Sequence, residues 1–330
     1  MRDLLLERKV KDYDIATSAH PNEVKGLFRN CRLIGRRFRL AHILFRGRKI
    51  IEVSTFRRHA GFSDDGELLI KSDNTFGTAV EDALRRDFTV NGLFYNIADF
   101  TVIDYVGGLK DLERKVIATI GDPEIRFRED PIRMLRAVRF ASRLGFTFDR
   151  PTEKAIRKHR KEIWKGAVPR ILDDTLRMLQ QGAAADSFRI LHELDILKVI
   201  LPRLARDFAD DAVRARILLN LRALDEMSRP KEGLSGALLA SVLYLQSFNI
   251  LLEGKNPGAD RTRLAAELLE ADLSPLRFPK MQFERAKQML AAQDRLENVG
   301  KKRQNAPQGA VLRTGGSNTR GGPMRWCGRY

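Results

Sequence analysis

The spacing of apolar residues changes along the chain near residue 121. Before it, short apolar stretches typical of strands alternate with helical spacing, which predicts a helix at 21–31 and strands at 11–17, 32–45, 49–56, 100–106 and 115–119. The last two are expected to pair across Gly107-Gly108. After residue 121 the spacing is helical as far as 297, with breaks at 166–169, 202, 230–236 and 254–258. The pattern predicts an α+β fold, with a mixed sheet first and helices afterwards.

Two helices near this change have clear start signals. Thr78 and Glu81 fit a capping box for a helix that ends near Arg86. Asp130-Pro131 fits the N-cap and first position of a second helix, which Gly145 would close. Within this second helix, four arginines fall within about 120° of one another on a helical wheel: Arg133, Arg136, Arg139 and Arg143.

Charge is the unusual feature of the composition. The 330 residues include 60 Lys and Arg against 43 Asp and Glu, a net charge of +17. Stretches without any acid hold this surplus: 24–51 has nine basic residues, 131–148 has four and 301–330 has seven. Such stretches predict an anionic partner, with nucleic acid favoured over a membrane surface. The Gly-rich basic tail at 300–330 is predicted to be disordered.

Composition also excludes several classes of protein. Two cysteines and five scattered histidines cannot build a disulfide framework or a Cys-rich zinc site. The first residues do not form a signal peptide, and the longest apolar run, from Gly236, is half of the roughly 20 residues that span a bilayer. We expect a soluble, cytoplasmic protein with no membrane contact.

The first candidate for chemistry is Asp12-Tyr13-Asp14. In a strand, residues two apart point to the same face, so the two carboxylates would lie side by side. Adjacent carboxylates repel each other unless a cation lies between them, and Mg²⁺ prefers such oxygen ligands. A pair of this kind can hold two metal ions at a phosphorus centre.

Two further motifs carry charges suited to a nucleotide. Arg85 and Arg86 suit phosphate oxygens, Asp87 offers a carboxylate and Asn91 can bind a sugar or base. These four could instead only tie a helix end to the sheet. Later in the chain, the acceptor Asp130 and the donor Arg133 could together match the edge of adenine or cytosine, or could be a helix cap beside an exposed arginine.

With these motifs in order, the chain resembles the class II nucleotidyltransferases, the family of bacterial poly(A) polymerases and CCA-adding tRNA nucleotidyltransferases. The resemblance is carried by KDYDIAT, IIEVSTFR, EDALRRDFTVNGLFYN, DYVGGLKDL and REDPIRMLRAVRFASRLGF. LIGRRFRLAHI at 33–43 resembles the poly(A) polymerase branch. Met1-Arg2-Asp3 resembles only the end of the family's GGxVRD turn, so we expect the head domain to lack its first strand.

The resemblance implies a role for each matching residue. Asp12 and Asp14 would bind two Mg²⁺ ions, and Asp87 would be the third catalytic acid. ATP would be contacted by Arg2, Asp3, Arg85, Arg86, Asn91, Asp130, Arg133 and Arg136, among which Asp130 and Arg133 would select the base. RNA would be contacted by Arg36, Arg37, Arg39, Arg139 and Arg143.

The implied organisation is a palm-like head at 1–120, a neck at 121–182, a helical body at 183–299 and the basic tail at 300–330. The implied activity is template-independent addition of AMP from ATP to RNA 3′ ends, impaired if the GGxVRD turn is lost. We expect a monomer, with RNA-decay or RNA-chaperone proteins as partners. Two alternatives stay open: CCA addition to tRNA, and a non-catalytic remnant of the family that binds RNA.

Overall fold

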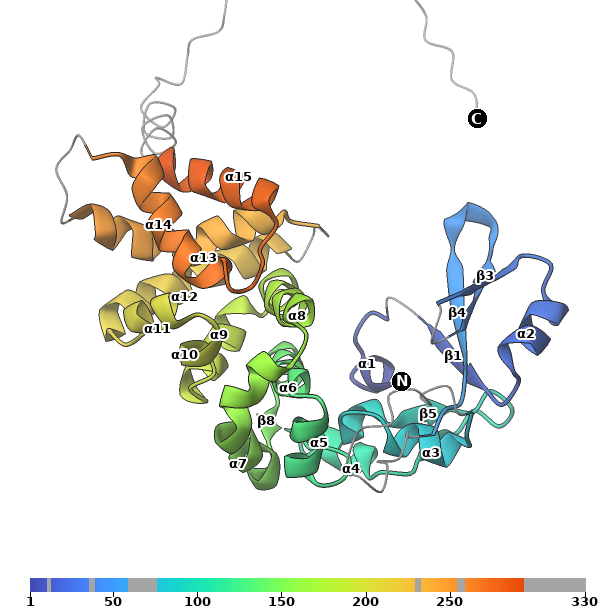
Figure 1. The fold of residues 1–330 in the computed structure, drawn as a ribbon. Coiled ribbons are helices and arrows are strands. Elements are labelled where there is room, and N and C mark those ends of the chain that lie inside the picture. Colours follow the sequence, from blue (N-terminus) through green and yellow to red (C-terminus); the bar gives the residue numbers. More distant parts are fainter. Residues whose placement is uncertain (11–12, 36–38, 59–75, 229–232, 254–258, 294–330) are drawn as a thin grey trace, which may run out of the picture. The chain divides into compact units, whose positions relative to one another are not determined.

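The computed structural model describes residues 1–10, 13–35, 39–58, 76–228, 233–253 and 259–293, nearly all of them in one unit, Met1–Leu290. The early part of the chain forms a four-stranded sheet in the order β1–β4–β3–β2 (Figure 1). Its strands are β1 (Asp14–Thr17), β2 (Cys31–Ile34), β3 (Leu40–Leu44) and β4 (Ile50–Thr55). β1 and β4 are parallel and the other neighbours are antiparallel, which confirms the predicted mixed sheet.

The two faces of this sheet differ in polarity. Helix α2 (Pro21–Leu27) covers one face, where Val24 packs with alternate residues of the strands in a small apolar cluster. The cross-strand register joins Arg32 to His42, His42 to Glu52, and Glu52 to Asp14. Because directly paired residues share a face, these four side chains form a polar row on the other face.

Two predictions in this region are wrong in their boundaries. The apolar stretch at 32–45 is two strands, β2 and β3, because Gly35 turns the chain with a φ of +99°. The helix predicted at 21–31 ends at Leu27, and Phe28 is extended. Apolar spacing alone did not reveal these ends, because apolar residues resume soon after each of them, at Cys31 and at Leu40.

The next segments confirm one start signal and correct one pairing. Thr78 caps α3 (Ala79–Leu84), and its hydroxyl accepts a hydrogen bond from the Glu81 amide at 3.3 Å. A 3₁₀ turn at Thr89–Asn91 follows. β5 (Leu93–Tyr95) pairs with β6 (Val102–Asp104), and β7 (Val116–Ile117) pairs with β8 (Thr147–Phe148). The predicted pairing of 100–106 with 115–119 is therefore wrong.

The reason for this error is a helix where the sequence indicated a turn. The Asp104 carboxylate accepts hydrogen bonds from the amides of residues 106–109 and starts α4 (Gly108–Glu113). Gly108 is required there, because an added Cβ would lie 2.2 Å from the carbonyl oxygen of Thr89. The glycine pair thus opens a helix against the 3₁₀ turn rather than a hairpin.

From residue 123 onward the described chain is mostly helical, as predicted. Its helices are α5 (Pro123–Glu129), α6 (Ile132–Leu144), α7 (Arg150–His159), α8 (Val168–Gln180), α9 (Ala184–Glu193), α10 (Leu197–Ile200), α11 (Pro202–Phe208), α12 (Asp211–Ser228), α13 (Gly236–Glu253), α14 (Arg261–Leu273) and α15 (Lys280–Ala291). Together with the sheet they confirm the α+β class. The predicted basic tail, 300–330, lies outside the described residues.

The start of α6 differs from the prediction. Asp130 ends α5 and Pro131 precedes the first residue of α6, so the Asp-Pro pair joins two helices. The Asp130 carboxylate still accepts a hydrogen bond from the Ile132 amide at 3.3 Å. At the other end Gly145 closes α6 with a φ of +71°, as predicted.

Two buried aspartates fix helix starts in the helical part. Asp225 of α12 accepts the amides of Ala184 and Ala185 at 2.6 and 3.1 Å, at the start of α9. Asp272 of α14 accepts the amide of Leu204 at 2.9 Å and the hydroxyl of Tyr244 at 2.7 Å. Each carboxylate satisfies backbone donors that have no partner within their own helix.

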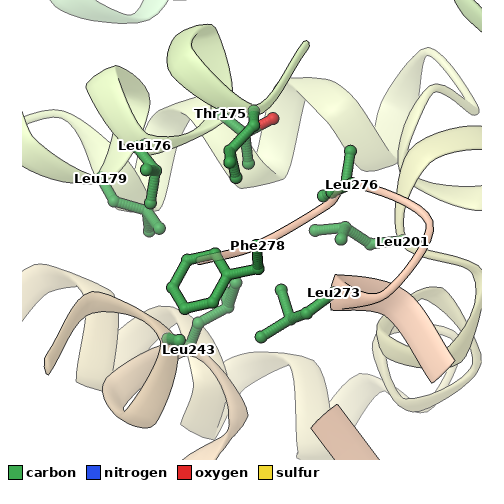
Figure 2. Close-up of a pocket in the computed structure, with 10 residues that line it drawn as sticks. Thr175, Leu176, Leu179, Leu201, Leu243, Leu273, Leu276 and Phe278 are labelled. Atoms are coloured by element: carbon green, nitrogen blue, oxygen red, sulfur yellow. The ribbon is translucent and has the colours of Figure 1, made fainter. Parts of the chain in front are cut away.

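Helix α13 belongs to the core of this helical part. It is long and apolar enough to cross a membrane, but half of it is buried against other helices. Leu243 of α13, Leu176 of α8 and Phe278 enclose an apolar cavity of about 20 Å³ (Figure 2). The hydroxyl of Thr175 at its wall donates to the Ile171 carbonyl, so the cavity offers no free polar group to a ligand.

Candidate active site

Two carboxylates lie side by side on the polar face of the sheet. Asp14 begins β1 and is the register partner of Glu52 in β4. Asp14 is exposed, and the side chain of Glu52 is 49% exposed. Nε2 of His42 lies 3.4 Å from Oε1 of Glu52. Asp12, predicted to complete this group, lies outside the described residues.

Glu52 was not among the predicted site residues. The signal that could have found it is its place in KIIEVSTF, where one carboxylate interrupts an apolar strand. A charged side chain on the exposed face of a strand, next to Asp14, does not contribute to the apolar core. The structure therefore adds Glu52 to the candidate carboxylates.

Asp87 has a different environment from Asp14 and Glu52. It is 8% exposed, and one carboxylate oxygen accepts Nε of Arg136 at 2.8 Å. The other accepts the Asn91 amide at 3.0 Å and the Phe88 backbone amide at 2.9 Å. Burial alone would raise the pKa of Asp87, but Arg136 and these hydrogen bonds outweigh it and lower the pKa.

These contacts leave Asp87 little capacity to bind a metal ion. Both of its oxygens have donors from within the chain, and one of these donors carries a full charge. Asp87 was predicted as the third catalytic acid. In this structure its carboxylate contacts Asn91 and Arg136, two residues predicted to contact the nucleotide, and its catalytic role stays a prediction.

The arginines after α3 are held by a single buried carboxylate. Asp82, 3% exposed, accepts Nε of Arg85 at 2.9 Å through one oxygen and Nε of Arg86 at 3.2 Å through the other. Arg86 also donates to the Asn91 carbonyl at 2.8 Å, and its guanidinium lies 4.4 Å from the Phe94 ring centroid. Both arginine side chains are about a third exposed, so each can still reach an anion.

The N-terminal residues lie against the same group. Arg2 of α1 (Arg2–Leu5) donates to the Asn91 side chain and lies over the ring of Phe140 in α6. Asp3 is bound by Arg2 and, at 3.2 Å, by Arg143 of α6. Burial opposes ionisation of Asp3, but these arginines prevail and its pKa is lowered. Of the two predicted residues, Arg2 thus contacts Asn91, and Asp3 contacts Arg2.

Arg126 was missed by the sequence analysis. It is buried, and its guanidinium donates to the backbone carbonyls of Arg85, at 2.7 Å, and of Arg86. It thereby joins α5 to the segment after α3. No sequence pattern marks this contact, because the two carbonyl oxygens lie 41 and 40 residues earlier in the chain.

The predicted base-selecting residues lie at the junction of α5 and α6. Glu129 binds Nη1 of Arg133 at 2.9 Å. Asp130 is bound by both terminal nitrogens of Arg170 in α8, at 3.1 and 2.8 Å. The Asp130 and Arg133 side chains are 24% and 15% exposed. Each is therefore oriented by another charged residue while remaining partly accessible.

The predicted RNA contacts fall into three situations. Arg39 is exposed, whereas Arg36 and Arg37 lie outside the described residues. Arg139 is buried and its Nε lies 2.9 Å from Asp174 of α8, so it ties α6 to α8 rather than facing solvent. Arg143 is a quarter exposed beside Asp3.

The donor set at the sheet fits Mg²⁺ in its chemistry. Asp14 and Glu52 offer carboxylate oxygens from neighbouring strands, the ligands that Mg²⁺ prefers. Among the described residues, no group of three or more His, Cys, Asp or Glu side chains is arranged so that it could hold a metal ion. Asp12, two residues before Asp14, would belong to the same group by sequence.

Two parts of the chain match known protein families. Residues 1–118 match the family described as the poly A polymerase head domain, and residues 145–208 match a probable RNA and SrmB-binding site of polymerase A. Poly(A) polymerase I of Salmonella typhi is 42% identical over 255 residues, 74% of this chain and 55% of that protein. The chain thus spans little more than half of that relative.

CCA-adding enzymes are similar as well. That of Lactobacillus johnsonii is 40% identical over 192 residues, which cover 58% of this chain and 47% of that enzyme. The crystal structure of the Bacillus stearothermophilus CCA-adding enzyme with CTP is similar with a TM-score of 0.57 and 26% identity, and covers 88% of this chain and 76% of that one. With the acidic pair on the sheet and the charged junction of α5 and α6, these findings show that the chain belongs to the class II nucleotidyltransferase family.

Proposed function

We propose that this chain transfers AMP from ATP to the 3′ hydroxyl of RNA without a nucleic-acid template. The observation that carries the proposal is the carboxylate pair of Asp14 and Glu52, exposed together on one face of the sheet. Similarity to poly(A) polymerase I supports the choice of reaction. In the transfer, the 3′ oxygen forms a bond to the α-phosphorus, the bond to the β-phosphate oxygen breaks, pyrophosphate leaves and the hydroxyl proton passes to water.

Asp14 and Glu52, with Asp12, would hold the Mg²⁺ ions. Bound there, such ions would activate the hydroxyl and stabilise the charge of the leaving group. The two carboxylates themselves come from hydrogen-bonded neighbouring strands, so the sheet fixes their spacing before substrate binds. Asp87 acts at one remove, because it orients Arg136 and Asn91.

The arginines after α3 suit the triphosphate. Arg85 and Arg86 are pre-oriented by Asp82, which limits the side-chain entropy lost when they bind an anion. At the junction of α5 and α6, Asp130 would accept from the amino group of adenine and Arg133 would donate to a ring nitrogen. Protein side chains would thus take the place of a template.

The experiment that tests the proposal is nucleotide incorporation into an RNA primer, with labelled ATP or CTP supplied separately. We expect repeated addition of AMP and little use of CTP. Since the CCA-adding enzyme of Lactobacillus johnsonii is also similar, CCA addition is the second candidate. Use of CTP followed by a stop after three nucleotides would establish it instead. Binding of RNA without any incorporation would favour a non-catalytic protein.

A further inference from the structure

A surface groove of about 600 Å³ lies beside the sheet, away from the carboxylate pair and from the junction of α5 and α6. One wall is the segment that leaves α2, residues 27–30, and the other is the end of β3 and its turn, residues 43–46. In Figure 1 these segments are the end of α2 and the hairpin that joins β3 to β4. The groove is at the opposite end of β2 and β3 from Arg39.

The groove exposes large apolar side chains. Leu27 is 77% exposed, Phe28 42% and Phe45 50%. The apolar cluster under α2 is complete without them, since it is made by Val24 with residues of the strands. Two aromatic rings at the walls of an open groove are suited to a planar partner. A ring face can stack on any nucleic-acid base, because every base is planar and aromatic.

The charge around the groove is of one sign. Arg29 and Arg46 line it and are exposed, and neither forms an ion pair with a carboxylate in the described parts of the chain. Residues 24–51 include no aspartate or glutamate. Arginines of α6 contrast with these, since Arg136 and Arg143 each bind a carboxylate of the chain. Among the described residues, no carboxylate therefore competes with an outside anion for these two arginines.

We propose that this groove binds the single-stranded part of the RNA substrate, with bases stacked on Phe28 and Phe45 and phosphates on Arg29 and Arg46. This proposal rests on the proposed function for the presence of an RNA substrate. It names a contact that the motif-bearing residues do not supply. Combined stacking and phosphate contacts are the means by which proteins bind single strands without regard to sequence.

The position of the groove suits RNA close to the reacting end. Leu44 pairs with Ile50 in the register, two residues before Glu52, a separation of about 7 Å along the strand. The edge strand β2 lies three strand spacings, about 14 Å, from β1 and Asp14. These separations are in the plane of the sheet, and Ile43 of the groove belongs to the face under α2. RNA would therefore pass around the end of the sheet between the groove and a 3′ end placed at Asp14 and Glu52.

Charge also disfavours a second copy of the chain as occupant. A two-fold symmetric contact brings the same patch of both copies together. Arg29 and Arg46 of one copy would then face those of the other, with no acid in residues 24–51 to compensate. A polyanion with planar bases satisfies both features of the groove, whereas a second copy satisfies only the apolar one.

The test compares binding of a labelled 20-nucleotide oligo(A) by the full-length chain and its variants, measured by fluorescence anisotropy at several salt concentrations. F28A/F45A is expected to weaken binding by at least about tenfold, since loss of one stacked base costs about 1–3 kcal/mol. R29Q/R46Q is expected to weaken binding and to reduce the salt slope by about 1.4, from two lost phosphate contacts. F100A, at a ring 75% exposed elsewhere, is the matched control and should bind as the wild type does.

Further measurements distinguish a failure of the groove proposal from a failure of the proposed function. Thermal unfolding and circular dichroism check that each variant is folded, and a preference for long over three-nucleotide primers should shrink in F28A/F45A. If the wild type binds and extends RNA but F28A/F45A binds it equally well, the groove proposal is overturned and the proposed function stands. If the wild type neither binds nor extends RNA, the proposed function itself fails. Loss of a wild-type dimer in F28A/F45A, with RNA binding unchanged, would identify a second copy as the occupant and overturn the proposal.

Discussion

Arg136 in the middle of α6 places its Nε 2.8 Å from the carboxylate of Asp87, 49 residues earlier in the chain. The same carboxylate accepts a hydrogen bond from the side-chain amide of Asn91. The side-chain oxygen of Asn91 in turn accepts a hydrogen bond from Arg2. Three segments that are distant in the sequence therefore meet at Asp87 and Asn91. This arrangement separates an acid that organises the site, Asp87, from the acids that face solvent, Asp14 and Glu52.

The substitution Asp87→Asn should destabilise the protein. It removes the charge that neutralises Arg136 and leaves buried donors poorly matched, which costs about 1–3 kcal/mol in free energy of unfolding. Urea denaturation followed by circular dichroism measures this cost. The matched control is Asp173→Asn, which breaks an exposed Asp–Arg pair on α8 and should change stability by less than about 0.5 kcal/mol. Equal effects of the two substitutions would contradict the organising role of Asp87.

The pH dependence of stability should report the same acid. The folded-state pKa of Asp87 is lowered below the unfolded value of about 3.9, so its contribution is present above that pH and is lost as the pH falls through the folded pKa. The stability difference between wild type and Asp87→Asn should therefore be constant near pH 6–7 and shrink below about pH 4. A difference that grows on acidification would have the opposite sign and would exclude the assignment. Unfolding curves at a series of pH values provide the measurement.

Arg170 should influence nucleotide selection through Asp130. Its two nitrogens at 3.1 and 2.8 Å fix the orientation of that carboxylate. In Arg170→Ala the carboxylate can rotate, and we expect KM for ATP to rise about tenfold and the preference for ATP over CTP to fall. Steady-state incorporation with each nucleotide measures both. Arg177→Ala removes an arginine of the same helix that binds Asp173, and it should leave selection unchanged. If the two variants select alike, Arg170 has no such role.

The cavity at α13 predicts a stability effect that is independent of the site. Leu243 is 2% exposed and lines the cavity, so Leu243→Ala enlarges an existing void and should cost about 2–5 kcal/mol (Figure 2). Leu219→Ala, at a leucine 63% exposed on α12, should cost no more than about 0.5 kcal/mol. Denaturant midpoints compare them. A small cost at Leu243 would show that the surrounding helices collapse into the space.

The sequence predicted elements and motifs better than their connections. The capping box at Thr78 and the closing glycine Gly145 depend on neighbouring residues, and both were found. The pairing of β7 with β8 joins segments far apart in the sequence and was missed, and the pairing of β6 with β5 was missed because no strand was predicted at 93–95. The apolar period of a strand does not identify its partner.

The site shows the same limit. Residue types identified Asp14, Arg85 and Asp130 as candidates, but the role of an acid depends on what binds it. Asp87 looks like another catalytic acid in the sequence, and only its three-dimensional neighbours show that its oxygens are already bound. Glu52 lies in IIEVSTFR but was not singled out there, and its candidacy comes from the register with Asp14.

The most direct test of this division of roles is the initial rate of AMP incorporation into an RNA primer by Glu52→Gln and Asp87→Asn, measured at a temperature where both variants are folded. We predict that Glu52→Gln keeps the wild-type unfolding temperature and loses at least about 100-fold in rate, because a ligand for the reacting centre is gone. Asp87→Asn should unfold at a lower temperature and retain the higher rate of the two. A Glu52→Gln variant as active as the wild type, beside an inactive but fully stable Asp87→Asn, would contradict the account.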